Sequence, residues 1–186
     1  MEKLFKQLSD AQASLFVLFH KTWIYHWNVT GPDFQQLHTL FGDQYVTMFE
    51  ELDRLTEHLR YLNMKPVSTL TRITEVSSIE QAANSAQGIN AKGMVKDLMT
   101  SNQTFISLLT DAHNSADRLE SLGTTNVLED LMETHGKFVW MLRSMSETAR
   151  ATSAVEDIAP VEPVQESVII EEPVTEDIVV ESTTEE

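Results

Sequence analysis

Four side chains of the kinds that bind metal ions follow one another at defined distances in the first third of the chain. His38 lies 12 residues after His26. Asp53 and Glu57 lie 15 and 19 residues after His38. On a helix with about 100° per residue, Asp53 is about 60° and Glu57 about 100° around the axis from His38. The three therefore share one face, near an apolar stripe where ionisable groups need partners, ions or water.

One chain cannot bring His38 and Glu57 to the same metal ion, because 19 helical residues span ~28 Å. If this helix packs antiparallel against a copy of itself, with a two-fold axis near residue 48, His38 approaches Asp53 and Glu57 of the partner subunit. A two-fold contact is self-complementary, so one such pairing makes two identical sites. His26 can fold back over a Gly-Pro turn to join His38.

Two imidazoles and two carboxylates suit Fe(II), Zn(II) or Mn(II) better than Ca(II) or Cu(I). Mixed nitrogen and oxygen ligation with open positions allows water or peroxide to reach a redox metal. Two simpler interpretations stay open at this point. A histidine on an apolar face is more often a hydrogen-bonded core residue, and Asp53, Arg54 and Glu57 could form a solvated face.

The composition divides the chain into two parts. Residues 151–186 hold 11 acidic side chains, no Lys or Arg and no aromatic residue. Such a segment cannot bury enough apolar surface to offset its ordering entropy, so we expect a disordered acidic tail after a domain at 1–150. Its apolar pieces at 168–170 and 177–181 could be docking motifs, although a solvating tail is the simpler interpretation.

Several protein classes are disfavoured by what the sequence lacks. The chain has no cysteine, which excludes disulfides and thiolate metal sites. It has no zinc-finger, P-loop or GxGxxG pattern, no apolar signal core and no apolar run long enough to span a membrane. A cytoplasmic protein without membrane association is therefore the expectation.

Apolar residues recur at helical spacing through most of residues 1–150. We expect long helices at 3–28, 34–62, 91–121 and 126–150, with a short helix at 77–86. Asp33 and Thr125 are predicted N-caps, and Gly123 is predicted to end the third long helix. Four long helices with a long crossover between the second and third predict an all-α, ferritin-like four-helix bundle.

The stretches HWNVTGPDFQQLHTLFGDQY (26–45) and ELDRLTEHLRYL (51–62) resemble the Dps family (DNA protection during starvation), or mini-ferritins. The likeness also includes THGKFVWMLRS (134–144) and covers about 1–150. It implies a dodecameric hollow shell built from two-fold dimers, in which Fe(II) is oxidised by hydrogen peroxide or dioxygen and stored as Fe(III). This protects against oxidative damage.

The resemblance assigns the ferroxidase ligands to His26 and His38 of one chain and to Asp53 and Glu57 of its partner. It places Trp27 beside the site, where this ring could pack on the ligands and take up stray oxidising equivalents. Core packing is an equally good interpretation of Trp27.

Two positions depart from the family pattern. The family usually has an acid four residues after the second histidine, where this chain has Gly42; Asp43 is rotated by about 100° and cannot replace it. We therefore expect a weakened ferroxidase, and expect Gly42→Glu to tighten iron binding. Asn126 stands where an acid often lines an iron-uptake pore. Glu129 and Asp130 could supply that charge, or could simply favour the start of a helix.

The charge pattern argues against direct DNA binding, because the N-terminus offers only Lys3 and Lys6 and the tail is acidic. The alternative to a ferroxidase is a catalytically weakened cage whose acidic tail recruits a partner. No feature of the sequence identifies such a partner.

Overall fold

A computed structural model describes residues 1–82 and 88–155, with side chains given up to residue 146 in the last helix. All regular secondary structure in these ranges is helical, which confirms the all-α prediction. The elements are α1 (Glu2–Asn28), α2 (Phe34–Tyr61), α3 (Leu70–Val76), α4 (Ala91–Asp117) and α5 (Leu122–Val155). The predicted acidic tail beyond Val155 lies outside the described residues.

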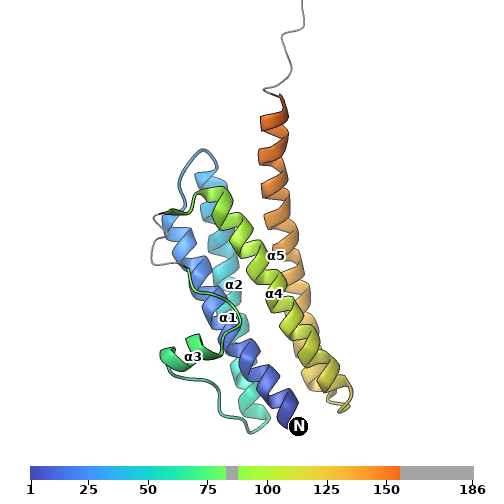
Figure 1. The fold of residues 1–186 in the computed structure, drawn as a ribbon. Coiled ribbons are helices and arrows are strands. Elements are labelled where there is room, and N and C mark those ends of the chain that lie inside the picture. Colours follow the sequence, from blue (N-terminus) through green and yellow to red (C-terminus); the bar gives the residue numbers. More distant parts are fainter. Residues whose placement is uncertain (83–87, 156–186) are drawn as a thin grey trace, which may run out of the picture.

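The four long helices form a bundle with one long crossover (Figure 1). α1 and α2 run antiparallel, the crossover carries the chain back along the bundle, and α4 and α5 form a second antiparallel pair. α1 packs against both α2 and α4, whereas α2 and α5 touch only sparsely. This order of helices confirms the predicted ferritin-like connectivity.

The core is made by the apolar stripe of each helix. Fully buried side chains include Leu4, Leu8, Leu15 and Leu18 of α1, Phe41, Met48, Leu55 and Leu59 of α2, Met94, Leu98, Phe105 and Leu109 of α4, and Leu128, Leu131 and Leu142 of α5. The helical spacing of these residues is what predicted the helices. None of the described helices combines the length and the apolar character that a membrane span requires.

The short crossover helix is present, but not where we predicted it. α3 covers Leu70–Val76, residues 77–82 are not helical, and the rest of the predicted 77–86 helix lies outside the described residues. The Ser77 hydroxyl accepts the Ile79 N–H at 3.0 Å and donates to the Ile79 carbonyl at 2.9 Å. Such local bonds compete with helical ones, so Ser77 ends α3 instead of opening a helix.

The connection between α4 and α5 also differs from the prediction. The break lies at 118–121, where Glu120 has a φ of +52°, and α5 already begins at Leu122. Gly123 and Thr125 are therefore inside the first turns of α5. A residue other than glycine can adopt a positive φ and end a helix, as Glu120 does. The positions of Gly123 and Thr125 therefore predicted the break a few residues too late.

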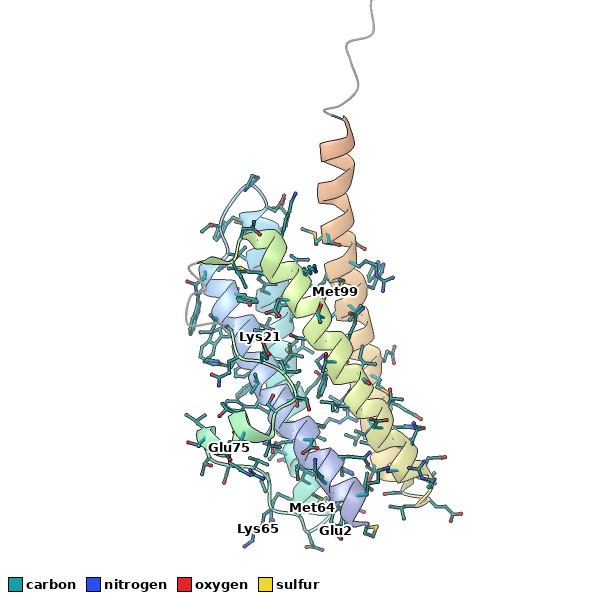
Figure 2. All side chains as sticks on the ribbon, viewed as in Figure 1. Glu2, Lys21, Met64, Lys65, Glu75 and Met99 are labelled. Atoms are coloured by element: carbon teal, nitrogen blue, oxygen red, sulfur yellow. The ribbon has the colours of Figure 1, made fainter. Side chains whose placement is uncertain are left out.

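A buried ionic cluster fastens the C-terminal part of α1 to α4. Lys21, which Figure 2 labels on α1 beside α4, is 2% exposed and lies 3.0 Å from Asp97 and from the Ser101 hydroxyl. The Tyr25 hydroxyl donates to the same carboxylate, at 2.6 Å from Asp97 Oδ2. Burial, and then the Asp97 carboxylate, raise the pKa of Tyr25, so the phenol remains a donor. This cluster positions the helical turn that carries His26.

Candidate metal centre

A tight turn between α1 and α2 brings the two predicted histidine ligands together. Gly31 adopts a φ of +112°, a conformation that a side chain would strain, and its carbonyl accepts the Phe34 N–H at 3.1 Å. Asp33 occupies the N-cap position of α2 as predicted, although its side chain makes no capping hydrogen bond. The turn reverses the chain so that the last turn of α1 faces the first turns of α2.

His26 and His38 bind each other's backbone. His26 Nδ1 lies 2.7 Å from the His38 carbonyl oxygen, and His38 Nδ1 lies 2.8 Å from the His26 carbonyl oxygen. A carbonyl can only accept, so each Nδ1 carries the proton. In the neutral rings the lone pair is then on Nε2, the state in which an imidazole binds a metal. The observed arrangement is compatible with a pair of metal ligands, because both Nε2 atoms keep their lone pairs.

The two imidazole rings stack on each other and are enclosed by aromatic side chains. Their centroids are 3.8 Å apart with an interplanar angle of 21°. Phe34 stacks on His38 at 5.1 Å, and Tyr45 meets the His26 ring edge-on at 5.2 Å. Both histidines are half-buried, so part of the pair is exposed at the surface of the chain.

The carboxylates of Asp53 and Glu57 lie on α2 well beyond the histidine pair. Both are exposed, and neither forms a hydrogen bond or ion pair within the described part of the chain. In the described residues of one chain, no group of three or more His, Asp, Glu or Cys side chains gathers around a common point. The structure thus assembles the imidazole half of the predicted site and leaves the carboxylate half free.

Gly42 lies directly against the His26 ring. A Cβ at this position would be 3.2 Å from His26 Cε1 and 3.3 Å from Nδ1, which is closer than ordinary van der Waals contact. The ring cannot retreat without weakening its bond to the His38 carbonyl. This changes the expectation for Gly42→Glu, because the added carboxylate would come at the expense of the His26 position.

Asp43 does not replace the missing acid. Its side chain borders the groove between α2 and α5, a cavity of about 370 Å³ that also contains Leu40 and Trp140. This groove is on a different side of α2 from the His26 ring that touches Gly42. The structure therefore agrees with the rotation of about 100° expected from helical geometry.

Trp27 is 55% exposed and packs on Trp23, with ring centroids 4.5 Å apart. Its ring makes no stacking contact with either histidine in the described chain. Trp23 in turn contacts Tyr45, which touches His26. Trp27 is therefore linked to the histidine pair through two other rings, and core packing does not explain its exposure.

The acids near the predicted pore each have a nitrogen-bearing neighbour. Asp130 forms an ion pair with Arg54, and Glu129 lies 2.8 Å from His113 Nε2. The Arg54 guanidinium partly compensates the Asp130 carboxylate and reduces the charge that it offers to a cation. His58, next to Glu57, bonds the Thr124 hydroxyl at 3.0 Å and points toward α5. Burial, and then Arg54, lower its pKa and favour the neutral ring.

A second histidine centre in the bundle core was not predicted. His135 is fully buried, and its Nδ1 donates to Asn102 Oδ1 at 2.6 Å, since the Asn102 amide donates to the Leu98 carbonyl. His135 Nε2 lies 3.1 Å from Glu51 Oε2. The present orientation is not that of an ideal hydrogen bond, yet the distance is one that a shared proton bridges. Glu51 could have been noticed as an acid on the apolar stripe of α2.

Comparisons with known proteins agree with the ferritin-like fold. A family model described as a ferritin-like domain matches residues 5–151. A DNA protection during starvation protein 2 of Bacillus anthracis is 32% identical over 144 residues, covering 77% of this chain and 94% of the relative. An uncharacterized low temperature-induced protein of Nostoc is 33% identical over 141 residues, covering 75% and 78%.

A solved structure of a Dps protein from Bacillus brevis superposes with a TM-score of 0.73 at 28% identity, covering 77% of this chain and 95% of that one. The ferritin-like helix order, the paired histidines and these relatives lead to the same assignment. The chain belongs to the Dps family of ferritin-like proteins.

Proposed function

We propose that this protein is a Dps-like mini-ferritin, which oxidises Fe(II) between two-fold-related subunits and stores the ferric product in a hollow shell. The observation that carries the proposal is the crossed pair of Nδ1–carbonyl bonds at 2.7 and 2.8 Å. These bonds leave both Nε2 atoms as lone-pair donors beside an open face. Asp53 and Glu57 of the partner subunit would complete the ligand set.

The stacked rings suit two neighbouring iron positions better than one shared position. An imidazole lone pair lies in the plane of its ring, and the two planes here are inclined by only 21° with centroids 3.8 Å apart. Lone pairs confined to two separate, stacked planes do not readily converge on one ion. A spacing of about 3.5–4 Å is typical of two-metal sites, and two Fe(II) ions are what a two-electron oxidant requires.

The proposed reaction is the oxidation of two Fe(II) by one hydrogen peroxide. Each Fe(II) gives up one electron, the O–O bond of peroxide is cleaved, and two hydroxide ions form. Because both electrons go to one peroxide, hydroxyl radical is not released. Dioxygen is a possible second oxidant. Trp27, exposed and connected to the histidines through Trp23 and Tyr45, would accept stray oxidising equivalents.

The name of the Bacillus anthracis relative, DNA protection during starvation protein 2, supports a protective role. We propose that this chain protects against oxidative damage as a dodecamer built from two-fold dimers. We do not propose direct DNA binding for this chain. Lys6 is paired with Asp10, which leaves Lys3 as the unpaired basic side chain of the first ten residues. Affinity for DNA depends on neutralising phosphates, and the acidic residues of 151–186 oppose it.

A weakened cage remains the second candidate, because Gly42 removes a carboxylate that the family usually has. In that case the shell would act chiefly through interactions of its acidic tail. The crossed histidine bonds favour the ferroxidase, since a site that had lost its function would have no need of two oriented Nε2 donors.

Anaerobic loading of the purified protein with Fe(II), followed by addition of peroxide, tests the proposal. Ferric absorbance should rise much faster than with free iron, and His38→Ala should abolish the acceleration. His20→Ala is the matched control, because His20 is an exposed histidine on α1 away from the site. Oxidation no faster than that of free iron would favour the weakened cage.

A further inference from the structure

The outward face of α2 carries two ridges of residues spaced four apart. The first ridge is Phe34, His38, Gly42 and Val46, and the second ridge is Phe49, Asp53, Glu57 and Tyr61. Their large apolar members are unusually exposed: Phe34 42%, Val46 49%, Phe49 60% and Tyr61 79%. These four side chains span about half of the circumference of α2. A soluble helix rarely leaves so many of them uncovered, so a partner should cover them.

The two ridges are complementary under a two-fold axis. In an antiparallel pair of identical helices, residue numbers rise along one helix where they fall along the other. A step of four residues forward in one subunit therefore faces a step of four residues backward in its partner. If His38 faces Glu57 of the partner subunit, every other pairing follows from equal rise per residue. The resulting pairs are Phe34 with Tyr61, His38 with Glu57, Gly42 with Asp53, and Val46 with Phe49.

Both ridges are rows of residues spaced four apart, the rows that interdigitate in the commonest class of helix crossing. The chemistry of each pair is also compatible. Apolar side chains meet at the centre, an imidazole meets a carboxylate on either side, and an aromatic pair closes each end. Glycine at position 42 leaves room for the partner's Asp53 next to the His26 ring.

We propose that Tyr61 of each subunit lies on Phe34 of its partner and closes the His38 side of the metal site. This inference rests on the proposed function, since it takes its register from the pairing of His38 with Glu57. Phe34 already stacks on His38 at 5.1 Å and 29°. The partner's Tyr61 would extend this stack from Phe34 outward.

Such a clasp has two consequences. Covering the outer face of Phe34 holds the His38 ring in its orientation toward the partner's carboxylates and excludes bulk water from that flank of the site. It also contributes to the dimer, because aromatic pairs stabilise beyond the area they bury. Tyr61 acts here as a positioning residue and not as a ligand.

Cross-linking tests the register directly, because the chain has no native cysteine. A full-length Phe34→Cys/Tyr61→Cys variant treated with a short bismaleimide should give covalent dimers. Within one chain these positions are 27 residues, or ~40 Å, apart along α2, so the link must join two subunits. The single-cysteine variants and a Gln36→Cys/Tyr61→Cys variant are controls, since Gln36 borders the groove toward α5.

A His38→Cys/Glu57→Cys variant distinguishes failure of the clasp from failure of the two-fold site. Cross-linking of 38 with 57 but not of 34 with 61 would overturn the clasp and leave the proposed site standing. Absence of both links would overturn the two-fold site itself, and the clasp with it. Cross-linking of both pairs, with none in the controls, is the expected result.

Substitution of Tyr61 tests the contribution to assembly and to the reaction. We expect Tyr61→Ala to weaken the dimer roughly tenfold or more, because each dimer loses two aromatic pairs, and to slow iron oxidation. Tyr61→Phe should retain both properties. Trp140→Ala, which removes an aromatic ring that is 60% exposed on α5, is the control. Equal dimer affinity and rate for Tyr61→Ala and Trp140→Ala would overturn the clasp.

Discussion

The molecule holds histidine in two contrasting settings, one on the outer face of α1 and α2 and one in the core between α2, α4 and α5. In both, Nδ1 is tied to a carbonyl-type oxygen: a backbone carbonyl for His26 and His38, and Asn102 for His135. The settings differ at Nε2. In the outer pair, Nε2 has no partner among the described residues, whereas His135 Nε2 lies 3.1 Å from Glu51 Oε2 in the core.

This difference separates a ligand from a structural group. The same tautomer is selected in both places, so the hydrogen bond at Nδ1 alone does not make a metal site. What matters is whether the second nitrogen already has a partner inside the chain. In the core, His135 Nε2 faces a carboxylate of the same chain, whereas the Nε2 atoms of the outer pair face none among the described residues. The proposed site supplies that partner from a second subunit and an ion.

The largest effect should come from removing one member of the core pair, Glu51 and His135. We expect His135→Ala to lower the free energy of unfolding by about 3–5 kcal/mol, because it leaves the Glu51 carboxylate buried without its partner. The oxidation rate of the folded protein should stay close to that of the wild type. Urea denaturation gives the first quantity and peroxide-driven oxidation the second.

Glu51→Gln is the matched control for this variant. The amide can donate to His135 Nε2, so the loss should be much smaller than for His135→Ala. A loss as large for Glu51→Gln would mean that a charged pair, and not a single shared proton, holds the two side chains together.

The next effect concerns the outer pair and has the opposite pattern. We expect His26→Ala to reduce the oxidation rate on the order of a hundredfold, since loss of a ligand should cost at least as much as loss of its supporting group. The free energy of unfolding should fall by only about 1 kcal/mol, the value of one partly exposed hydrogen bond. A stability loss like that of His135→Ala would make the outer pair structural and remove the contrast.

The smallest effect should come from Gly42. We expect Gly42→Ala to weaken Fe(II) binding by roughly two- to tenfold, because its Cβ displaces a ring held by a single short hydrogen bond. Calorimetric titration with Fe(II) under anaerobic conditions measures this. Gly42→Glu compared with Gly42→Ala then isolates the contribution of the added carboxylate. Unchanged affinity in Gly42→Ala would restore the simpler view that Gly42 only lacks a ligand.

Much of the fold was predictable because helical periodicity is a local property. The stripes of α1, α2 and α4 placed these helices within a few residues, and the crossover implied the ferritin-like order. The errors occurred where one side chain or one backbone angle decides where a helix begins or ends, as at Ser77 after α3 and at Glu120 before α5. Composition does not distinguish a serine that opens a helix from one that ends it.

The sequence by itself determined which residues could form the metal site, because spacing along a helix fixes both the angle and the distance between side chains. It placed His38, Asp53 and Glu57 on one face and predicted that a metal site formed by them needs a second subunit. Only the tertiary structure decided the rest. The crossed histidine bonds, the contact of Gly42 with His26 and the pairing of Glu51 with His135 join different helices or opposite sides of a turn. Their geometry depends on how those elements pack, which no local pattern encodes.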